Sequence, residues 1–384
     1  MKLEPSTTPP ADPGPENPDL QRQNRSSFNP PRSDEGDVKN FRYPFAFSHN
    51  RVTPDAGWAR QVTVRDMPIA TTVAGVNMRL EKGAIRELHW HIPAEWAYII
   101  TGRVRITGVD FEGRAFVDDL GPGDLWYFPA GIPHSIQAIS DDGSEFLLAF
   151  DDGAFSEFDT FLITDWFNHI PRDVLVQNLG WPPSAFDKLP PEELYIFAAK
   201  TPGSLEDDKK AAIGPQGEVP CPFSHRLLAQ PPDRRTPSGE VHIADSRNFK
   251  ASITIAVAHV CVRPGAMREL HWHPNADEWQ YYIAGNARMT VFEGGAKART
   301  IDFHPGDVGY IQKSLPHYIQ NTGDSDLEFL EIFKADKYQD VSLNQWLSHL
   351  PPQLVESHLN IPPGLVQKLP KEKQVIIPPN GPAK

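Results

Sequence analysis

The feature that most constrains the fold of this chain is an internal duplication. The six residues RELHWH occur at 86–91 and again, letter for letter, at 268–273. Further segments match around them, such as AEWAYIITGRVRIT with DEWQYYIAGNARMT and GDLWYFPAGIPHSIQ with GDVGYIQKSLPHYIQ. The offset is 182 residues before the histidine pair and 183 after it. Such self-similarity predicts two copies of one domain, and 384 residues are enough to give each copy its own core.

Each copy is patterned as a series of short β-strands. Apolar and polar residues alternate, as at Val76, Met78 and Leu80, and Gly, Pro or Asp interrupts the pattern every eight to twelve residues. This pattern is typical of an all-β sandwich or barrel. Helical patterning appears only after each copy, at about 164–179 and 343–359. We therefore expect an all-β fold of two tandem barrels, each with a small helical appendage.

The distribution of proline suggests where the domains begin and end. The 39 prolines concentrate in the first part of the chain, in its middle and in its last thirty residues. Residues 1–42 are rich in Pro, Asn, Asp and Ser without periodicity, which predicts an extended arm. We expect a first domain at 43–200, a loop-rich linker at 201–240, and a second domain with C-terminal helices and a tail at 241–384.

The charge and hydropathy of the chain narrow the classes of partner. The net charge is −13 and no long block of Lys or Arg occurs, which argues against a nucleic-acid partner. No uninterrupted apolar run is long enough to span a membrane, so no membrane partner is expected either. An acidic protein repels anions at long range. An anionic substrate would therefore need local arginine or metal charge for its capture.

The cysteines and the first residues bear on the compartment. Only Cys221 and Cys261 are present, and Cys261 lies in the apolar stretch HVCVRPG, so no disulfide framework is expected. Residues 1–20 contain no apolar core of a secretory signal. We expect a cytoplasmic protein; a secreted mature form, from which a signal was removed, is the alternative.

Each copy contains a set of residues that are typical metal ligands. Histidines i and i+2 of a β-strand project from the same face, and a glutamate and a third histidine follow each pair at nearly the same spacing in both copies. Three imidazoles and one carboxylate suit a divalent ion such as manganese or iron. A lone H-x-H pair would be weak support for a metal site, but four residues of ligand type recur at nearly the same spacing in two diverged copies. The expected ligands are His89, His91, Glu95 and His134, and in the second copy His271, His273, Glu278 and His317.

These residues carry a resemblance to a known family. The pattern G-x(5)-H-x-H-x(3,4)-E, followed by G-D and P-H, runs from Gly83 to His134 and again from Gly265 to His317, and it is similar to the double motif of the cupin superfamily. With RELHWH twice, EWAY, EWQYYI and DVSLNQWL, the chain resembles the bicupin oxalate decarboxylases over about 43–360. The resemblance implies two double-stranded β-helix (jelly-roll) barrels, one manganese ion in each, and a trimer or hexamer.

The resemblance also implies a reaction. Oxalate decarboxylases split oxalate into formate and carbon dioxide with no net redox change, yet they need dioxygen. The site must supply a cation for the carboxylates, a metal for the electron and an acid for the proton. Arg86 and Arg268 are the candidate cations, because a guanidinium binds carboxylates through paired donors. Arg86 lies three residues before His89, which regular strand geometry would place on the opposite face, so either a β-bulge or a turn is expected there.

The two copies differ after the last strand of each barrel. Sixteen positions separate Phe150 from Trp166, but only thirteen separate Phe333 from Trp346. The three extra residues lie in DDGAFSEFDTF, where the resemblance implies a mobile lid at 156–160. Glu157 in this lid is the implied proton donor. The family more often has smaller polar residues where this chain has Phe158 and Asp159.

The second copy has an acid of its own. Glu331 stands in the apolar segment FLEIF, where the first copy has Leu148. A glutamate in such a strand is costly to bury unless it is paired or protonated. We expect Glu331 to face the second metal with a raised pKa. Whether the second centre is catalytic or structural stays open, and the lid favours the first.

Three functions fit this chain to different degrees. Manganese-dependent oxalate decarboxylase is the first. Oxalate oxidase uses the same substrate and metal but yields carbon dioxide and hydrogen peroxide, because no acid protonates the intermediate; Glu157 favours the decarboxylase. A storage-type bicupin would be non-catalytic and would need no intact ligand sets, whereas all eight ligands are present here.

Overall fold

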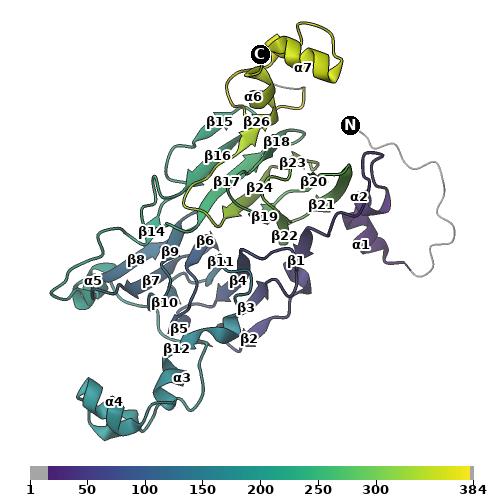
Figure 1. Ribbon diagram of the computed structural model, residues 1–384. Coiled ribbons are helices and arrows are strands. Elements are labelled where there is room, and N and C mark those ends of the chain that lie inside the picture. The colour runs from purple at the N-terminus through teal and green to yellow at the C-terminus, as the bar shows by residue number, and fades with distance from the viewer. Residues whose placement is uncertain (1–15, 381–384) are drawn as a thin grey trace. The chain divides into compact units, whose positions relative to one another are not determined.

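A computed structural model describes residues 16–380, which form two compact units, one for each repeat (Figure 1). The unit of the first repeat comprises Ser48–Gln230 with Asp245–Ile255. The unit of the second repeat comprises the chain up to Phe47, Pro231–Ala244 and the residues from Ala256 onward. The expected all-β class is confirmed. No helix of residues 16–380 is long and apolar enough to cross a membrane.

The unit of the first repeat is a barrel of two sheets whose strands all pair antiparallel. The seven-stranded sheet runs β14-β9-β6-β11-β4-β3-β2, and the other runs β12-β5-β10-β7-β8 with β13 beside β5. The strand bounds, in chain order, are β2 Arg51–Thr53, β3 Gly57–Val62, β4 Ala74–Leu80, β5 Ile85–Trp90, β6 Glu95–Thr101, β7 Val104–Val109, β8 Ala115–Leu120, β9 Leu125–Phe128, β10 His134–Ala138, β11 Ser144–Phe150, β12 Phe161–Leu162, β13 Ile196–Phe197 and β14 Ser224–His225.

The unit of the second repeat has the same design. Its seven-stranded sheet runs β1-β22-β19-β24-β17-β16-β15, and the other runs β21-β20-β23-β18-β25 with β26 beside β18. The strand bounds are β1 Arg42–Pro44, β15 Arg234–Thr236, β16 Gly239–Ala244, β17 Ala256–Val262, β18 Met267–Trp272, β19 Glu278–Ala284, β20 Ala287–Glu293, β21 Lys297–Phe303, β22 Asp307–Ile311, β23 His317–Asn321, β24 Leu327–Phe333, β25 Val341–Ser342 and β26 Ile376–Ile377.

The strand pattern of the sequence becomes the core of each barrel. Val76, Met78 and Leu80 on β4 are fully buried, as their alternation predicts. Trp126 on β9 and Phe146 on β11 contribute large buried rings, with centroids 5.2 Å apart. Aromatic rings of this size dominate the energetics of such a core, because each removes a large apolar area from water.

The two helical appendages are confirmed as well. In the first repeat they are α3 (Ile163–Asn168) and α4 (Arg172–Leu179), and in the second α6 (Leu343–Ser348) and α7 (Pro352–Leu359). α4 ends at Gly180 and α7 at Asn360, with φ values of 67° and 52°. Both residues are among the few that adopt the left-handed conformation readily, which is why each helix stops there.

Residues 16–42 are not wholly the extended arm that their composition predicts. Residues 1–15 lie outside the described residues, but two short helices follow, α1 (Pro18–Gln23) and α2 (Arg25–Phe28). Asn17 caps α1 with its side chain, which accepts from the Leu20 N–H at 3.2 Å. Asn and Ser interrupt the apolar periodicity that indicates a helix, yet they are also the residues that cap helices. Composition alone therefore did not predict these helices.

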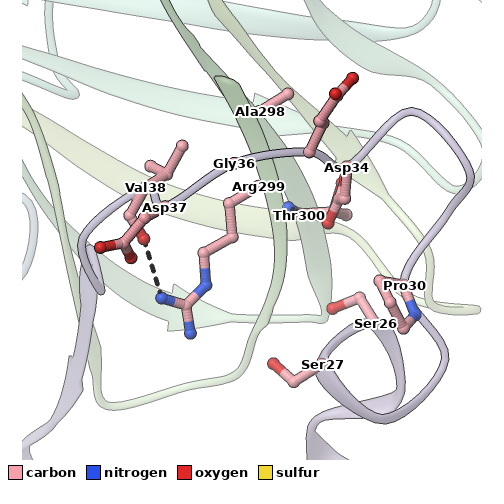
Figure 2. Close-up of a pocket in the computed structure, with 11 residues that line it drawn as sticks. Ser26, Ser27, Pro30, Asp34, Gly36, Asp37, Val38, Ala298, Arg299 and Thr300 are labelled. Atoms are coloured by element: carbon pink, nitrogen blue, oxygen red, sulfur yellow. Dashed lines mark hydrogen bonds between the residues drawn. The ribbon is translucent and has the colours of Figure 1, made fainter. Parts of the chain in front are cut away.

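The same segment packs against β21 of the second repeat. The Ser26 N–H donates to the Asp302 carboxylate at 2.7 Å. Arg299 donates to the carbonyl of Val38 at 3.0 Å, across a cavity of about 360 Å³ (Figure 2). Strand β1 then pairs with β22. The residues before Phe47 therefore belong to the second repeat, although they precede the first in sequence.

The expected linker at 201–240 is divided between the two units. Helix α5 (Leu205–Ala212) belongs to the first repeat, where Asp208 accepts from Arg105 at 2.5 Å. Strand β14 pairs with β9 of the same unit, whereas β15 pairs with β16 of the second. The border therefore lies near Gln230 and not at the expected positions. The prolines of this region lie in turns and loops between segments that pack against the two units. Composition alone cannot distinguish such turns from a free linker.

Candidate metal centres

The structure brings the four expected ligands of the first repeat together. His89 lies one residue before the end of strand β5, His91 follows that strand, Glu95 begins β6 and His134 begins β10. Their ligand atoms all lie within 4.8 Å of one another, and all four side chains are buried. Register explains the meeting, because His134 pairs directly with His89 across β10 and β5.

The imidazoles are oriented by the backbone. The Nδ1–H of His89, His91 and His134 each donates to a carbonyl two residues away, at 2.5–2.7 Å. A ring that donates from Nδ1 keeps the lone pair of Nε2 free, which is the usual state of a metal-binding histidine. Three Nε2 atoms therefore converge beside the Glu95 carboxylate, which lies 3.1 Å from His91 Nε2 and 3.5 Å from His134 Nε2.

The electrostatics of the centre favour the ligand forms of these groups. Burial, and then the charge of Arg86, hold the pKa of His89 well below its usual range. Burial also lowers the pKa of His134. For Glu95, burial alone would raise the pKa, but the neighbouring His134 and His91 lower it well below the usual value. Neutral imidazoles and an ionised carboxylate are the forms that bind a divalent cation.

The second repeat builds an equivalent centre. His271, His273, Glu278 and His317 are buried, and their ligand atoms also lie within 4.8 Å of one another. Within residues 16–380, the Nε2 atoms of the three histidines and Glu278 Oε2 are buried without a hydrogen-bond partner. Buried polar atoms without partners are costly. A divalent metal would satisfy all of them at once, so the residues present fit such an ion.

The two centres orient their glutamates by different means. In the first, Glu95 Oε1 accepts from the indole N–H of Trp126 at 2.7 Å. In the second, Glu278 Oε1 accepts from the amide of Gln280 at 2.6 Å. Gly309 stands where the first repeat has Trp126, and a Cβ at Gly309 would lie 2.6 Å from Gln280 Oε1. The glycine at this position leaves room for Gln280, which donates to Glu278 as Trp126 donates to Glu95.

A β-bulge resolves the awkward spacing of the candidate arginine. On β10, His134 and Ile136 are two residues apart, yet they pair with His89 and Arg86 of β5, which are three apart. One extra residue in β5 therefore brings Arg86 to the same face as His89. Of the two possibilities left open by the sequence, the bulge is confirmed. The side chain of Arg86 is only 1% exposed.

The second repeat carries the same bulge. Arg268 and His271 of β18 pair with Ile319 and His317 of β23, again three residues against two. Arg268 is completely buried. In each repeat, therefore, one arginine lies on the same face of the sheet as the histidine ligands of that repeat.

The lid residue Glu157 meets Arg86 beside the first centre. Glu157 is only 6% exposed, and its Oε2 accepts from Arg86 at 3.1 Å and from the Tyr195 hydroxyl at 3.0 Å. Its backbone N–H donates to the side chain of Gln61 at 3.0 Å. Arg86 also donates to the carbonyl of Tyr195 at 3.1 Å. Glu157 is thus held next to the cation of the first centre.

The sequence did not indicate Tyr195. It precedes β13, which pairs with β5 across from Arg86, and the second repeat has Val375 at the equivalent place. Burial, and then the charge of Glu157, raise the pKa of Tyr195 well above its ordinary value, so its hydroxyl stays a donor. A difference between copies at this position was the only signal, and the contact itself depends on pairing across more than a hundred residues.

The glutamate of RELHWH has a positioning role in both copies. Glu87 accepts from the backbone N–H groups of Thr164 and Tyr195, at 2.8 and 2.9 Å. In the second repeat, Glu269 accepts from the N–H of Val375 at 3.2 Å. These buried carboxylates fasten the segments that follow each barrel to the strand that carries the histidines.

The second centre has its own acid and tyrosine. Arg268 donates to Glu331 at 3.2 Å, and to the Tyr338 hydroxyl and Asp340, each at 2.7 Å. The Tyr338 hydroxyl donates to Glu331 at 3.2 Å. Burial raises the pKa of Glu331, although the charge of Arg268 opposes the rise. The raised pKa agrees with the expectation from the sequence. Here the glutamate comes from a strand, whereas in the first centre it comes from the lid.

Comparison with known proteins finds the same fold elsewhere. The Cupin family model matches residues 45–185 and 225–366. The chain is 54% identical to oxalate decarboxylase OxdC of Bacillus subtilis over 363 residues, which cover 94% of this chain and 93% of that protein. It is 41% identical to a probable oxalate decarboxylase of Arthroderma benhamiae, covering 93% and 88% of the two chains. A structure from a study of the Mn(II) centres of the Bacillus enzyme matches with a TM-score of 0.92, 54% identity and 95% of each chain.

Proposed function

The chain belongs to the cupin family, with one cupin domain in each repeat, and from this premise we propose that it is a manganese-dependent oxalate decarboxylase. The substrate is oxalate, and the products are formate and carbon dioxide. One observation carries the assignment beyond the family: Glu157 lies buried against Arg86, which the bulge in β5 places on the same face as His89. A carboxyl group at this place can give the proton that formate requires.

The residues of the two centres would hold two manganese ions per chain. His89, His91, Glu95 and His134 would bind one, and the equivalent four of the second repeat the other. When bound, manganese supplies a positive charge to the substrate carboxylate and a one-electron couple, with dioxygen as the co-reactant. Mixed imidazole and carboxylate ligands suit manganese and leave room for an exchangeable ligand.

Arg86 would bind and orient the substrate. Its guanidinium shares a face with His89 because of the bulge in β5, and it can donate two parallel hydrogen bonds to a carboxylate. Burial strengthens such a charge-assisted contact, since little water competes for the donors. An acidic protein needs this local cation to retain a dianion.

Glu157 would deliver the proton, and Tyr195 would hold it in position. When carbon dioxide leaves, the remaining one-carbon fragment would have to receive a proton at carbon and regain the electron given to the metal couple to become formate. Glu157 Oε2 accepts from both Arg86 and Tyr195, which fixes the carboxyl group against the cation that would hold the substrate. An acid held so close favours decarboxylase over oxidase, because the oxidase outcome requires that protonation fail. Arg268 and Glu331 form the corresponding pair at the second centre.

We propose that the protein assembles as a trimer or hexamer, on the resemblance to bicupins of this kind. Location in the cytoplasm stays a prediction from the sequence. The compositional arguments against a nucleic-acid or membrane partner stand beside these proposals as expectations.

A single assay tests the function. Purified protein, expressed with added manganese, is incubated with oxalate in air, and formate, hydrogen peroxide and metal content are measured together. We expect formate in large excess over peroxide, with close to two manganese ions per chain. Peroxide as the main product would instead identify an oxidase, and no turnover with full metal loading would favour the storage-type alternative.

A further inference from the structure

A second arginine contacts the lid from its outer side. Arg51 lies on the edge strand β2, and its guanidinium carbon is 3.6 Å from the ring centroid of Tyr195 and 5.2 Å from that of Phe158. Both distances lie within the range of cation–π attraction. Arg51 also forms an ion pair with Glu193. One guanidinium thus contacts two rings that flank the lid glutamate.

Phe158 is otherwise difficult to explain. Its side chain is 70% exposed, the next residue after a buried glutamate. Because the Phe158 ring is largely exposed, the hydrophobic effect contributes little to holding it in place. The contact with Arg51 gives this ring a partner, and a cation over a ring is attracted even where water is near.

The region between Arg51 and the lid is tightly filled. Arg51, Glu157, Phe158 and Tyr195 line one cavity of only about 20 Å³. A single water needs roughly 10–15 Å³ of such space, so this cavity holds about one water and is too small for oxalate. The side chains of Arg51, Phe158 and Tyr195 therefore leave little free space between them.

We propose that Arg51 is a positioning residue for the reaction: by stacking on Phe158 and Tyr195 it clamps the lid at 156–160 and holds Glu157 against Arg86. Among residues 16–380, the ion-pair and cation–π contacts of Arg51 are with Glu193, Phe158 and Tyr195, and none of these is a metal ligand. It acts through Tyr195, whose hydroxyl donates to Glu157, and through Phe158, the neighbour of Glu157 in the chain. The proposal rests on the proposed function, which assigns Glu157 the proton.

Hydrogen–deuterium exchange of the manganese-loaded protein tests the clamp without reference to turnover. The Glu157 amide donates outside the lid, to Gln61 at 3.0 Å, so opening of the lid releases it. The amides of Phe158 and Asp159 donate to Ser156 within the lid, at 3.3 and 2.9 Å, and they report on unfolding of the lid itself. We expect Arg51→Gln to accelerate exchange over 155–161 by about 3- to 10-fold, since each cation–π contact shifts such an equilibrium by about 2- to 5-fold. Exchange in strand β11 serves as the internal reference for global unfolding.

Ring variants separate the clamp from the ion pair. Phe158→Leu keeps an apolar side chain but removes the ring, and it should accelerate lid exchange as Arg51→Gln does. Phe158→Tyr should restore the parent rate. The double variant should exchange no faster than Arg51→Gln alone, because the two side chains act through one contact. Arg172→Gln, which breaks the exposed pair with Asp187, is the matched control and should change nothing.

Product partition supplies the second readout. We expect Arg51→Gln to raise the peroxide-to-formate ratio by about 2- to 5-fold while manganese content stays at the parent value. Lid exchange within twofold of the parent in Arg51→Gln would overturn the proposal, as would independent effects of Arg51→Gln and Phe158→Leu. If the parent itself makes no formate, the proposed function fails, but the exchange data still decide whether the clamp exists.

Discussion

At the scale of single residues, the ligands were readable from the sequence and their supports were not. All eight ligands stand in motifs that recur between the copies, so each copy confirms the other. Trp126 and Gln280, which orient the two ligand glutamates, occupy different strands in the two repeats. No comparison of the copies could have paired them, because their equivalence appears only once the strands are placed side by side.

This difference allows one centre to be weakened at a time. Trp126→Phe keeps the ring in the core but removes the hydrogen bond to Glu95, so we expect manganese affinity at the first centre to fall by about 10- to 100-fold. The second centre should keep its ion, and Gln280→Ala should show the converse. Metal titration followed by electron paramagnetic resonance measures both. Equal loss at the two centres from either variant would contradict the assignment of these supports.

The proton donor is testable through a single carboxyl group. Glu157→Gln keeps the size of the side chain and its contact with Tyr195, but an amide cannot donate a carboxylic proton. We expect formate production to fall by about 10²-fold or more, while peroxide persists or rises. Both products are measured in the same assay. Formate at the parent rate would mean that the proton comes from elsewhere, with Glu331 at the second centre the next candidate.

The substrate cation is testable by a change that preserves charge. Arg86→Lys keeps one positive charge but loses the paired donors, so oxalate turnover should fall by about 10²-fold or more if the contact strengthens in the transition state. Manganese content serves as the control and should stay at the parent value. Near-normal turnover would mean that Arg86 does not hold oxalate.

At the scale of elements, strand patterning predicted the barrels but not their local departures. A spacing of three residues between Arg86 and His89 is compatible with a bulge or with a turn, and only the pairing with β10 decides between them. Residues 1–42 were predicted to form an extended arm because they lack periodicity, and 16–42 of them are described. This described part is instead held by individual contacts of Ser26, Asp34 and Arg299, which leave no periodic trace in a sequence.

The length of the lid has a predictable effect on the products. Deleting Phe158–Thr160 leaves Glu157 in the chain but shortens the lid to the length of the second repeat. The glutamate can then no longer reach Arg86, so we expect the product ratio to move strongly toward peroxide, with full manganese content. Replacement of Asp159 and Thr160 by Gly and Ser keeps both the length of the lid and Phe158, and it is the control, which should retain most formate production. Equal formate from both variants would show that lid length is immaterial.

At the scale of the whole molecule, the duplication predicted two units, and the structure reveals where the second repeat has diverged. His259 on β17 stands where the first repeat has Asn77. Burial, and then the charge of His242, lower the pKa of His259 to about 4, whereas an unfolded histidine titrates near 6.5. The unfolded chain therefore binds more protons between these values, so stability is complete above about pH 6.5 and is lost as the pH falls toward 4.

Replacement of His259 by asparagine, the residue of the first repeat, should reduce the loss of stability at acid pH. At about 1.36 kcal/mol per pKa unit, protonation of His259 costs on the order of 3 kcal/mol across this range. We expect His259→Asn to lose less thermal stability than the parent between pH 7 and pH 4.5. Midpoints of thermal unfolding at the two pH values measure the difference. Parallel losses in both proteins would mean that other groups govern acid stability.

The bulge in the histidine strand also has a historical meaning. It occurs at the same place in both repeats, so the simplest history puts it in the single barrel that existed before the gene doubled. The two acids are not equivalent in this way. Glu157 lies in the lid and accepts from Tyr195, whereas Glu331 lies on strand β24 and accepts from Tyr338. The metal ligands and the arginine beside them are thus the part that the two repeats share, whereas each repeat pairs its arginine with an acid and a tyrosine from different elements.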